Sequence, residues 1–382
     1  MNNRDDMGRL QRLTVMMLTQ RIATMAAITG CALAVAAPAA AAVPAAGAVP
    51  FPRGLQPLST SWPTPLSGIV LAYPSHTTGA KPYLMATSDG GRTWRPLPAP
   101  PVRYPGNNDQ PDATWADGII AVTDGTHIVA TRDAGRHWSA ERLAGAPGSF
   151  YVDHLAIADG RVFALVTTAG AIGSAAVYAG LAQAGVLRPV RGLSITGSFV
   201  YGDITTAGAV QVDLGQSLAT ERYWYSRDGV HFTAAPLACP AATIPLLGGV
   251  HAGRPSALCG GQPGDPAPGQ TYKQVWAAAH LGGTFRPSGP VFASPQGERF
   301  TAASAQVMAV ATIFTVSVTV NAGRTWTVKL AKHNGASWTD LSFPSATTGV
   351  VVCSTTSNAL KRVATVYRTT DAGHTWHPLS LP

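Results

Sequence analysis

The chain has 382 residues, of which 46% are hydrophobic and 12% charged, and its formal net charge is +8. The hydrophobic share is high enough to bury a core, which excludes global disorder. The 40 glycines and 30 prolines argue against a helical bundle, because both residues interrupt helices. The basic residues are scattered rather than gathered in a stripe, which argues against a nucleic-acid partner. The composition therefore predicts short strands joined by many turns.

The first 42 residues are typical of a secretory signal peptide, in which basic residues precede an apolar run that ends in small residues. The basic residues are Arg4, Arg9, Arg12 and Arg21, the apolar run is Ile22–Val35, and the small residues are Ala36–Ala42. We expect cleavage after Ala42. This predicts a secreted or cell-envelope protein that begins with an Ala/Pro-rich linker over residues 43–54.

A second motif in the same segment would allow lipid attachment instead. Ile28-Thr29-Gly30-Cys31 is similar to a bacterial lipobox, which would place a lipid on Cys31. The chain stays apolar for another dozen residues after Cys31, whereas lipoproteins usually turn polar there, so cleavage is the preferred interpretation. An uncleaved anchor is the third alternative. No later segment has the 18 uninterrupted apolar residues that a membrane-spanning helix needs.

One sequence pattern recurs along the rest of the chain. Three copies agree closely, a fourth has Asn in place of Asp, and a fifth is one residue shorter. They are Thr87–Trp94 (TSDGGRTW), Thr131–Trp138 (TRDAGRHW), Thr369–Trp376 (TTDAGHTW), Thr319–Trp326 (TVNAGRTW) and Ser226–Phe232 (SRDGVHF). Degenerate copies are Ala278–Phe285 and Leu181–Arg188. The last positions of the copies are 41 to 53 residues apart, which is the length of a four-stranded propeller blade.

The pattern Ser/Thr-x-Asp-x-Gly-x-Thr-Trp resembles the Asp box of the BNR-repeat propellers. That superfamily includes sialidases, xyloglucanase-type glycoside hydrolases, sortilin-type receptors and photosystem assembly factors. The resemblance implies an all-β fold, a seven-bladed β-propeller over residues 55–382 with a box turn between the third and fourth strands of each blade. The expected blades are 55–97, 110–143, 150–190, 195–237, 241–287, 297–330 and 337–382. The box implies little about function, because enzymes and non-enzymes share it.

The residue types of the box suit a tight turn. The carboxylate can accept hydrogen bonds from main-chain N–H groups of its own turn, glycine can adopt a left-handed conformation, and the aromatic residue returns into the blade. We therefore assign the box residues structural roles: Asp89, Gly91, Trp94, Asp133, Gly135, Trp138, Asp228, Phe232, Asn321, Gly323, Trp326, Asp371, Gly373 and Trp376. Gln183 and His280 lack the capping oxygen, so their turns should be looser.

Three cysteines follow the signal segment. Export permits oxidation, and Cys239 and Cys259 are close enough in sequence to close a local loop, so we expect a disulfide between them. Cys353 lies in an apolar run, which predicts a buried side chain. These spacings do not match a zinc site, and no metal site or cofactor is expected.

In propellers, function usually belongs to the face opposite the boxes, which is formed by the loops between strands two and three and between blades. The long loops expected here are 73–81, 98–111, 145–153, 213–221, 260–271 and 287–297. Polar and aromatic residues in or near them are the candidates for a site. The binding candidates are Arg103, Tyr104, Asp109, Asp112 and Tyr201; the weak catalytic candidates are Asp203, Asp213, Glu221, Arg222, Tyr223 and Arg299; Asp153, Asp265 and Glu298 complete the set.

Two functions from different classes remain open. A sialidase-like or xyloglucanase-like glycoside hydrolase needs convergent acidic residues, and a sialidase also needs three arginines and a Tyr–Glu pair. Glu221, Arg222, Tyr223 and Arg299 could contribute, but the sialidase signature near the mature N-terminus is missing, and sialidases have six blades. The preferred interpretation is a non-catalytic exported propeller that binds an extracellular protein, peptide or cell-surface glycan through aromatic loop residues.

Overall fold

We describe a computed structural model of the protein. The structure describes residues 55–74, 78–105, 111–168, 172–198, 200–216, 220–241, 243–261, 270–295, 299–331, 336–355 and 365–379. All described residues belong to one compact unit within Ala40–Pro382. The expected signal segment, Cys31 and the linker lie outside the described residues, as do Asp109, Asp265 and Glu298.

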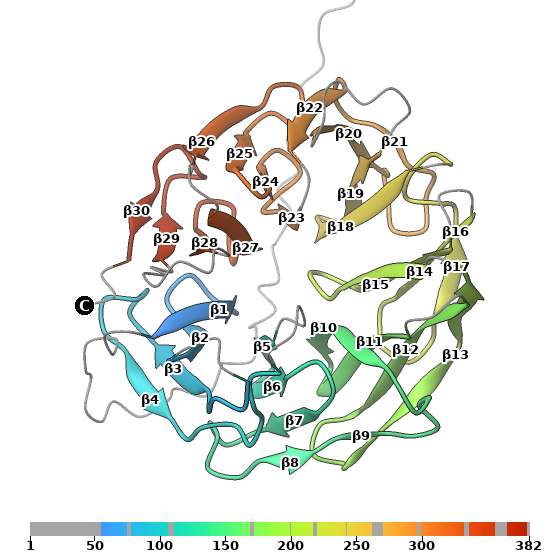
Figure 1. Ribbon diagram of the computed structural model, residues 1–382. Helices are drawn as coiled ribbons and strands as arrows, with labels where there is room; N and C mark the ends of the chain where they lie inside the picture. Colours follow the sequence, from blue (N-terminus) through green and yellow to red (C-terminus); the bar gives the residue numbers. More distant parts are fainter. Residues whose placement is uncertain are drawn as a thin grey trace, which may run out of the picture. The chain divides into compact units, whose positions relative to one another are not determined.

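The described residues form an all-β structure of seven antiparallel sheets, which are the blades of a β-propeller (Figure 1). Blade 1 comprises β1 Gln56–Ser61, β2 Gly68–Tyr73, β3 Tyr83–Thr87 and β4 Arg95–Leu97; blade 2 comprises β5 Asp112–Ala116, β6 Ile119–Thr123, β7 Ile128–Thr131 and β8 Ser139–Ala140. Blade 3 comprises β10 Tyr151–Ala158, β11 Arg161–Thr168, β12 Gly173–Leu181 and β13 Val186–Gly197; blade 4 comprises β14 Val200–Thr205, β15 Val210–Gln216, β16 Thr220–Ser226 and β17 Thr233–Ala235.

Blade 5 comprises β18 Ile244–His251, β19 Arg254–Gly260, β20 Gln270–Ala277 and β21 Arg286–Pro287; blade 6 comprises β23 Arg299–Ala302, β24 Met308–Ala311, β25 Thr315–Thr319 and β26 Thr327–Ala331. Blade 7 comprises β27 Ala336–Ser342, β28 Gly349–Thr355, β29 Thr365–Thr369 and β30 His377–Pro378. Blades 1 and 7 are each built from four consecutive strands, which matches the expected closure of the ring without an exchanged strand.

Two blades depart from the simple pattern. β9 Arg142–Leu143 leaves blade 2 and pairs in parallel with β13, so it becomes the edge of blade 3. β13 is also longer than expected and continues to Gly197, past the predicted end of that blade at residue 190. In blade 5 the outer strand is split, because β21 pairs with one half of β20 and β22 Phe292–Pro295 pairs with the other. The loop expected at 287–297 is therefore partly strand.

The core lies between neighbouring blades, where apolar side chains of the middle strands meet. At the junction of blades 7 and 1, Val70 and Met85 pack with Val350 and Val366, all fully buried. The second strands supply much of this core because both of their faces are covered, which explains continuous runs such as Gly68–Tyr73 and Ile119–Thr123. This packing joins the two ends of the described chain.

The recurring turn between strands three and four is held by its own side chains. Around Asp89, the Thr93 main-chain N–H donates to Oδ1 (2.9 Å) and the Thr93 hydroxyl to Oδ2 (2.6 Å), while Gly91 N–H donates to the Thr87 hydroxyl (2.9 Å). Corresponding bonds recur at Asp133 and Asp371. They recur also at Asn321, except that its Nδ2 donates to the Thr325 hydroxyl. Gly91 has a φ of 86°, which glycine adopts without strain.

These hydrogen bonds favour the ionised carboxylate. Partial burial raises the pKa of Asp89, but the bonds from Thr93 and Thr87 outweigh it and leave the pKa below its ordinary value. The pKa values of Asp133, Asp228 and Asp371 are also well below ordinary. At Asp133 and Asp228 the bonds from His137 and His231 dominate, whereas at Asp371 burial opposes the bonds from Thr375 and Thr369. These carboxylates therefore act as fixed acceptors in their turns.

The turn at Gln183 is held by a residue that the sequence pattern does not reveal. Gln183 has a φ of 68°, and its N–H donates to Oε1 of Glu141 (2.6 Å). Glu141 is 3% exposed and comes from the connection between β8 and β9. Burial raises the pKa of Glu141, while bonds from Gln183 and Gly185 oppose that shift. A carboxylate from outside the turn thus replaces its missing Asp, instead of the looser turn that was expected.

Candidate functional site

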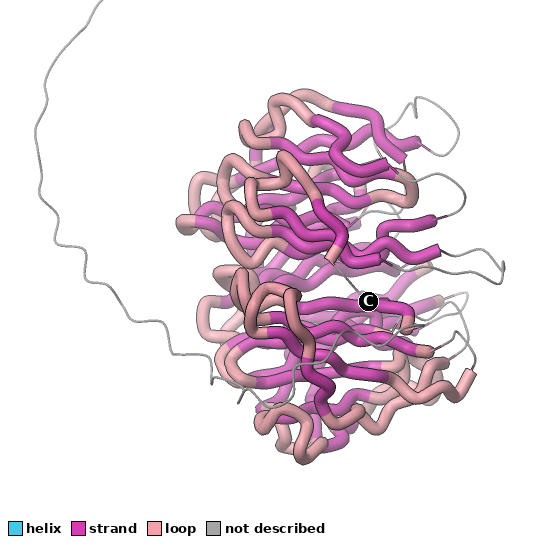
Figure 2. The backbone as a smooth tube through the Cα atoms, turned by 90° about the vertical axis from the view of Figure 1, so that its left-hand side faces the viewer, coloured by secondary structure: helices cyan, strands magenta, loops and turns pink. Residues whose placement is uncertain are grey.

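The first strands of all seven blades surround a central cavity of about 890 Å³. These strands are β1, β5, β10, β14, β18, β23 and β27, which lie nearest the centre in Figure 1. Because each blade is antiparallel, the recurring turns and the turns between strands one and two share one face of the ring, visible as the loops on the left in Figure 2. The connections between blades and between strands two and three belong to the opposite face, which we call the loop face.

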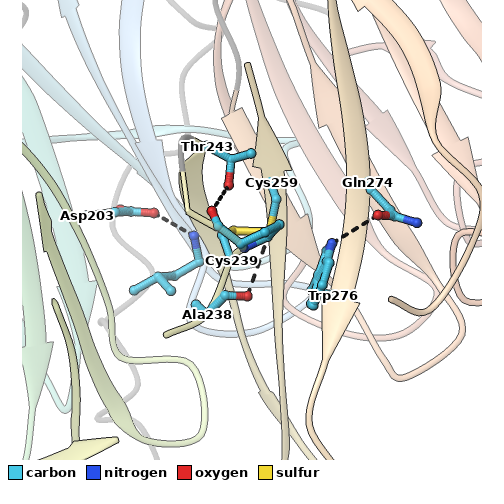
Figure 3. Close-up of a disulfide and its surroundings, with 9 residues drawn as sticks. Asp203, Ala238, Cys239, Thr243, Cys259, Gln274 and Trp276 are labelled. Atoms are coloured by element: carbon cyan, nitrogen blue, oxygen red, sulfur yellow. Dashed lines mark hydrogen bonds between the residues drawn. A yellow bond between two sulfur atoms is a disulfide. The ribbon is translucent and has the colours of Figure 1, made fainter. Parts of the chain in front are cut away.

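Three aspartates of the cavity wall join neighbouring blades, and we call Asp112, Asp203 and Asp340 the clasp aspartates. Asp203 accepts from its neighbour Ile204 N–H at Oδ1 (2.8 Å) and from Leu247 N–H of blade 5 at Oδ2 (2.7 Å). The two oxygens therefore hold main-chain groups of two different blades. Figure 3 shows Asp203 reaching this main-chain nitrogen.

The other two clasp aspartates repeat this arrangement. Asp112 accepts from Ala113 N–H at Oδ1 (2.8 Å) and from Leu155 N–H of blade 3 at Oδ2 (3.1 Å). Asp340 accepts from Leu341 N–H at Oδ1 (2.8 Å) and from Thr60 N–H of blade 1 at Oδ2 (2.5 Å). The last of these bonds crosses the seam at which the first and last blades meet.

A serine makes a comparable link between blades 1 and 2. Ser59 Oγ donates to Oδ1 of Asp112 (2.9 Å) and accepts from Ala113 N–H (3.2 Å). Ser61 lies two residues further along β1, and its Oγ accepts from Trp115 N–H (2.8 Å). Short polar side chains on the inner strands thus link neighbouring blades of the ring.

Asp340 differs electrostatically from the aspartates of the recurring turns. Burial raises its pKa to about 6; the Thr60 N–H bond and the charge of Arg299 oppose the rise, and the charge of Asp112 adds to it. Its folded pKa thus lies above the ordinary value of 3.8. The stability linked to Asp340 is complete below about pH 4 and is lost as the pH rises through about 6.

We predict a stability maximum near about pH 4. The turn aspartates have lowered pKa values, so their contribution is present above about pH 4 and is lost as the pH falls further. The melting temperature should fall by about 2–5 °C between pH 5 and pH 8 through Asp340. Thermal melts at pH 3–8 should show this fall flattened in Asp340→Asn. An equally steep fall in that variant would contradict the assignment.

Three of the weak catalytic candidates form one row across blade 4. Asp203 in β14 pairs with Asp213 in β15, which pairs with Tyr223 in β16. Asp213 is fully buried, and Tyr223 is 1% exposed and donates its hydroxyl to Oε1 of Gln211 (2.7 Å). Burial, followed by the charge of Asp213, raises the pKa of Tyr223 well above its ordinary value. Both residues therefore lie in the core of the blade, and the loop expected at 213–221 is mostly strand.

The remaining catalytic candidates lie apart from this row. Glu221 and Arg222 are in β16 opposite Gly215 and Leu214; the Arg222 side chain is exposed, and that of Glu221 is not among those described. Arg299 begins β23 and lines the central cavity. Arg299 acts electrostatically on Asp340, so it is the one candidate arginine that the structure places near a clasp aspartate.

The binding candidates divide between the loop face and the core. Arg103 is exposed between β4 and β5, whereas Tyr104 is 9% exposed and packs edge-on against Tyr73 with ring centroids 5.3 Å apart. Tyr201 lies against Gly215, where a Cβ would be 2.0 Å from its ring. Tyr104 therefore lies in the loop as expected, with its side chain buried against Tyr73. Asp153, by contrast, is exposed at the bulge in β10 and lines the cavity.

Asp124, which is not among the candidates named from the sequence, organises the loop beside Arg103. Its Oδ1 accepts from Thr126 N–H (3.0 Å) and His127 N–H (2.8 Å), and its Oδ2 from Arg103 N–H (3.4 Å). Burial raises the pKa of Asp124, but these main-chain bonds outweigh it and hold the pKa below ordinary. An Asp-Gly pair such as that at 124–125 is typical of a hairpin turn, but it does not predict this longer-range bond.

The disulfide lies at the junction of blades 4 and 5. Cys239, in the connection between the two blades, is bonded to Cys259 of β19 (Figure 3). Both cysteines are buried in one core cluster with Tyr223 and Phe285. The bridge therefore attaches the inter-blade connection to the second strand of blade 5. Cys353 is a buried free cysteine in β28.

Among the residues that the structure describes, no helix is long and apolar enough to span a membrane. No group of three or more His, Cys, Asp or Glu side chains is arranged there to hold a metal ion.

Comparisons with known proteins identify the fold and no closer relationship. No protein-family model and no curated protein sequence matches the chain. Among solved structures, YCF48 bound to D1 peptide is similar with a TM-score of 0.51 and 14% identity over 80% of this chain and 92% of that one. A PL25 ulvan lyase, a polysaccharide lyase, has a TM-score of 0.54 and 10% identity over 85% and 96% of the two chains. These similarities support a seven-bladed β-propeller.

Proposed function

We propose that this protein is an exported, non-catalytic propeller of the Asp-box type that binds an extracellular protein, peptide or cell-surface glycan. Its binding surface is the loop face around the mouth of the central cavity. YCF48 bound to D1 peptide has the same fold, so a propeller of this kind can hold a peptide. The fold alone does not separate binding from catalysis, since the ulvan lyase shares it.

The observation that carries the proposal is the use of the clasp aspartates. A glycoside hydrolase needs two carboxyl groups free to act on a sugar from opposite sides. Asp112, Asp203 and Asp340 line the cavity, yet each holds main-chain N–H groups of two blades with its two oxygens. Their geometry supports the ring rather than a reaction.

The exported protein should turn over neither fluorogenic sialosides nor a panel of plant and bacterial polysaccharides. It should bind some members of an immobilised peptide and glycan array, and this binding should saturate with protein concentration. Arg103→Glu, on the loop face, should weaken that binding at least about tenfold, since reversing an interfacial charge is costly. Arg136→Glu is the matched control, because Arg136 is exposed in a recurring turn on the opposite face.

Turnover that disappears in Glu221→Gln, with the melting temperature unchanged, would overturn the proposal in favour of a hydrolase. Equal loss of binding in Arg103→Glu and Arg136→Glu would instead contradict the assignment of the loop face. The turnover assay and the binding assay therefore give separate outcomes for catalysis and for the loop face.

A further inference from the structure

The face of the recurring turns is unevenly charged. We count each turn between strands one and two and between strands three and four, together with the strand residue at each of its ends. Over blades 1–3 these turns carry five arginines and four aspartates, the latter being Asp89, Asp117, Asp133 and Asp159. Over blades 4–6 they carry one aspartate and four arginines, which we call the arginine group: Arg227, Arg254, Arg286 and Arg324.

The excess of positive charge over blades 4–6 comes from missing aspartates. His280 and Asn321 occupy the position of the box aspartate in blades 5 and 6. The first hairpins of blades 4–6, over 205–210, 251–254 and 302–308, contain no Asp or Glu. The one aspartate, Asp228, accepts hydrogen bonds from Val230 N–H (2.9 Å) and His231 N–H (2.8 Å) within its own turn. The charges of the arginine group are therefore largely uncompensated on this surface.

The four arginines are also available to a ligand. All four side chains are exposed, and within the described chain none of them forms an ion pair. Arg324 donates one hydrogen bond, from Nε to Asn321 O (3.1 Å). Since a guanidinium group has five N–H donors, most of the donors of this group face solvent.

The turns that carry the arginine group adjoin one another. Gly282, in the turn of blade 5, lies against Tyr225 of blade 4, because a Cβ on Gly282 would be 2.7 Å from the Tyr225 hydroxyl. Ser288 Oγ donates to Ala322 O (2.9 Å), which joins the segment after β21 to the turn of blade 6. Arg254 of blade 5 and Ala322 of blade 6 line the same small cavity. The arginines thus belong to one continuous surface.

Exposed apolar side chains lie in the same turns. Val230 is 48% exposed and Val320 is 44% exposed. Arginine and exposed apolar residues together suit an anionic membrane, which attracts positive charge and takes apolar side chains into its interface. A soluble polyanion would gain little from the valines. Nucleic acid would need aromatic residues for stacking, but Phe285 is buried, and Phe232 and Trp326 pack against core clusters.

We propose that the arginine group, with Val230 and Val320, docks this protein on an anionic phospholipid surface. The guanidinium groups pair with lipid phosphates, and the valines enter the interface between headgroups and acyl chains. The loop face lies on the opposite side of the ring and stays open while the protein is docked (Figure 2). The docking surface is independent of the proposed function, because it uses no residue of the loop face.

Sedimentation with vesicles tests this surface in the exported protein. The affinity for vesicles with about 30% phosphatidylglycerol should exceed that for pure phosphatidylcholine at least about 20-fold, since each arginine contributes about fivefold. The ratio of the two affinities is the readout, because an apolar segment elsewhere in the chain would bind both kinds of vesicle. Arg254→Gln and Arg324→Gln should each lower the ratio about fivefold. Salt at about 0.5 M should lower it strongly in the unmodified protein.

Arg136→Gln is the matched control, since Arg136 is exposed in the turn of blade 2, on the same face but outside the arginine group. It should change the ratio less than about twofold. The exposed positions make misfolding of these variants improbable, and their melting temperatures check it. Equal affinity for the two kinds of vesicle would overturn the proposal, as would a loss in Arg136→Gln equal to that in Arg324→Gln.

A second pair of variants distinguishes a membrane from a soluble polyanion. Val230→Ser combined with Val320→Ser should weaken binding to the anionic vesicles about threefold, because it removes apolar area from the interface. Inorganic polyphosphate is the soluble probe. If polyphosphate binds more tightly than the anionic vesicles, and the valine variant binds both as the unmodified protein does, the partner is a soluble polyanion and the membrane assignment is wrong.

Discussion

Asp203→Ala should lower the free energy of unfolding by about 2–4 kcal/mol. The substitution removes the acceptors of Ile204 N–H in blade 4 and Leu247 N–H in blade 5. Alanine leaves both donors unsatisfied at the junction of the two blades, and the penalty for each is about 1–3 kcal/mol. Chemical denaturation followed by tryptophan fluorescence measures the loss.

Two variants separate this effect from simple removal of charge in the cavity. Asp203→Asn keeps one carbonyl oxygen, so it should lose about half as much stability. Asp159→Asn is the matched control, because Asp159 also lines the central cavity but is exposed and lies in a turn with a φ of 50°, which asparagine tolerates. Its effect should stay within about 0.5 kcal/mol. A loss in Asp159→Asn as large as in Asp203→Ala would contradict a specific role for the clasp.

The architecture was predictable because each blade carries its own local signal. The turn around Asp89 needs a threonine, a carboxylate, a glycine and a second hydroxyl within seven residues, and all four hydrogen-bonding groups are local. A pattern of this kind can be recognised from sequence and repeats at blade length. The seven antiparallel blades confirm the fold expected from that spacing.

The links between blades were not predictable in the same way. Asp112 accepts a bond from Leu155, 43 residues along the chain, and Asp340 bonds Thr60, 280 residues away. Glu141 serves a turn 42 residues distant. These hydrogen-bond partners depend on how neighbouring blades are aligned. A single sequence contains no pattern that indicates this alignment.

The candidate site was only partly predictable for a related reason. Composition and turn residues identify loops, but they do not tell how far a strand extends into a predicted loop. Asp213 and Tyr223 flank residues with low apolar content, yet β15 and β16 continue through them and bury both side chains. Asp112 and Asp203 were named as site residues, and the structure adds that their oxygens accept main-chain hydrogen bonds at blade junctions.

Removing the disulfide should also have a large effect on the free energy of unfolding, at the same blade junction as Asp203. Cys239 and Cys259 close a loop with a sequence separation of 20, and the bridge ties the connection after blade 4 to β19. Cross-linking a loop of this length restricts the unfolded chain, which stabilises the fold by about 3 kcal/mol. Both cysteines are buried, so the bridge also fills space in the core.

Replacing both cysteines by alanine should therefore lower the free energy of unfolding by about 3 kcal/mol. Because either single substitution breaks the same bridge, Cys239→Ala and Cys259→Ala should each cost nearly as much as the double variant. Cys353→Ala is the matched control: Cys353 is buried and free, so its cost of about 1 kcal/mol comes from lost packing alone and should add to that of the double variant. Single variants whose losses sum to that of the double variant would mean that the two residues contribute by packing and that the bridge does not stabilise this junction.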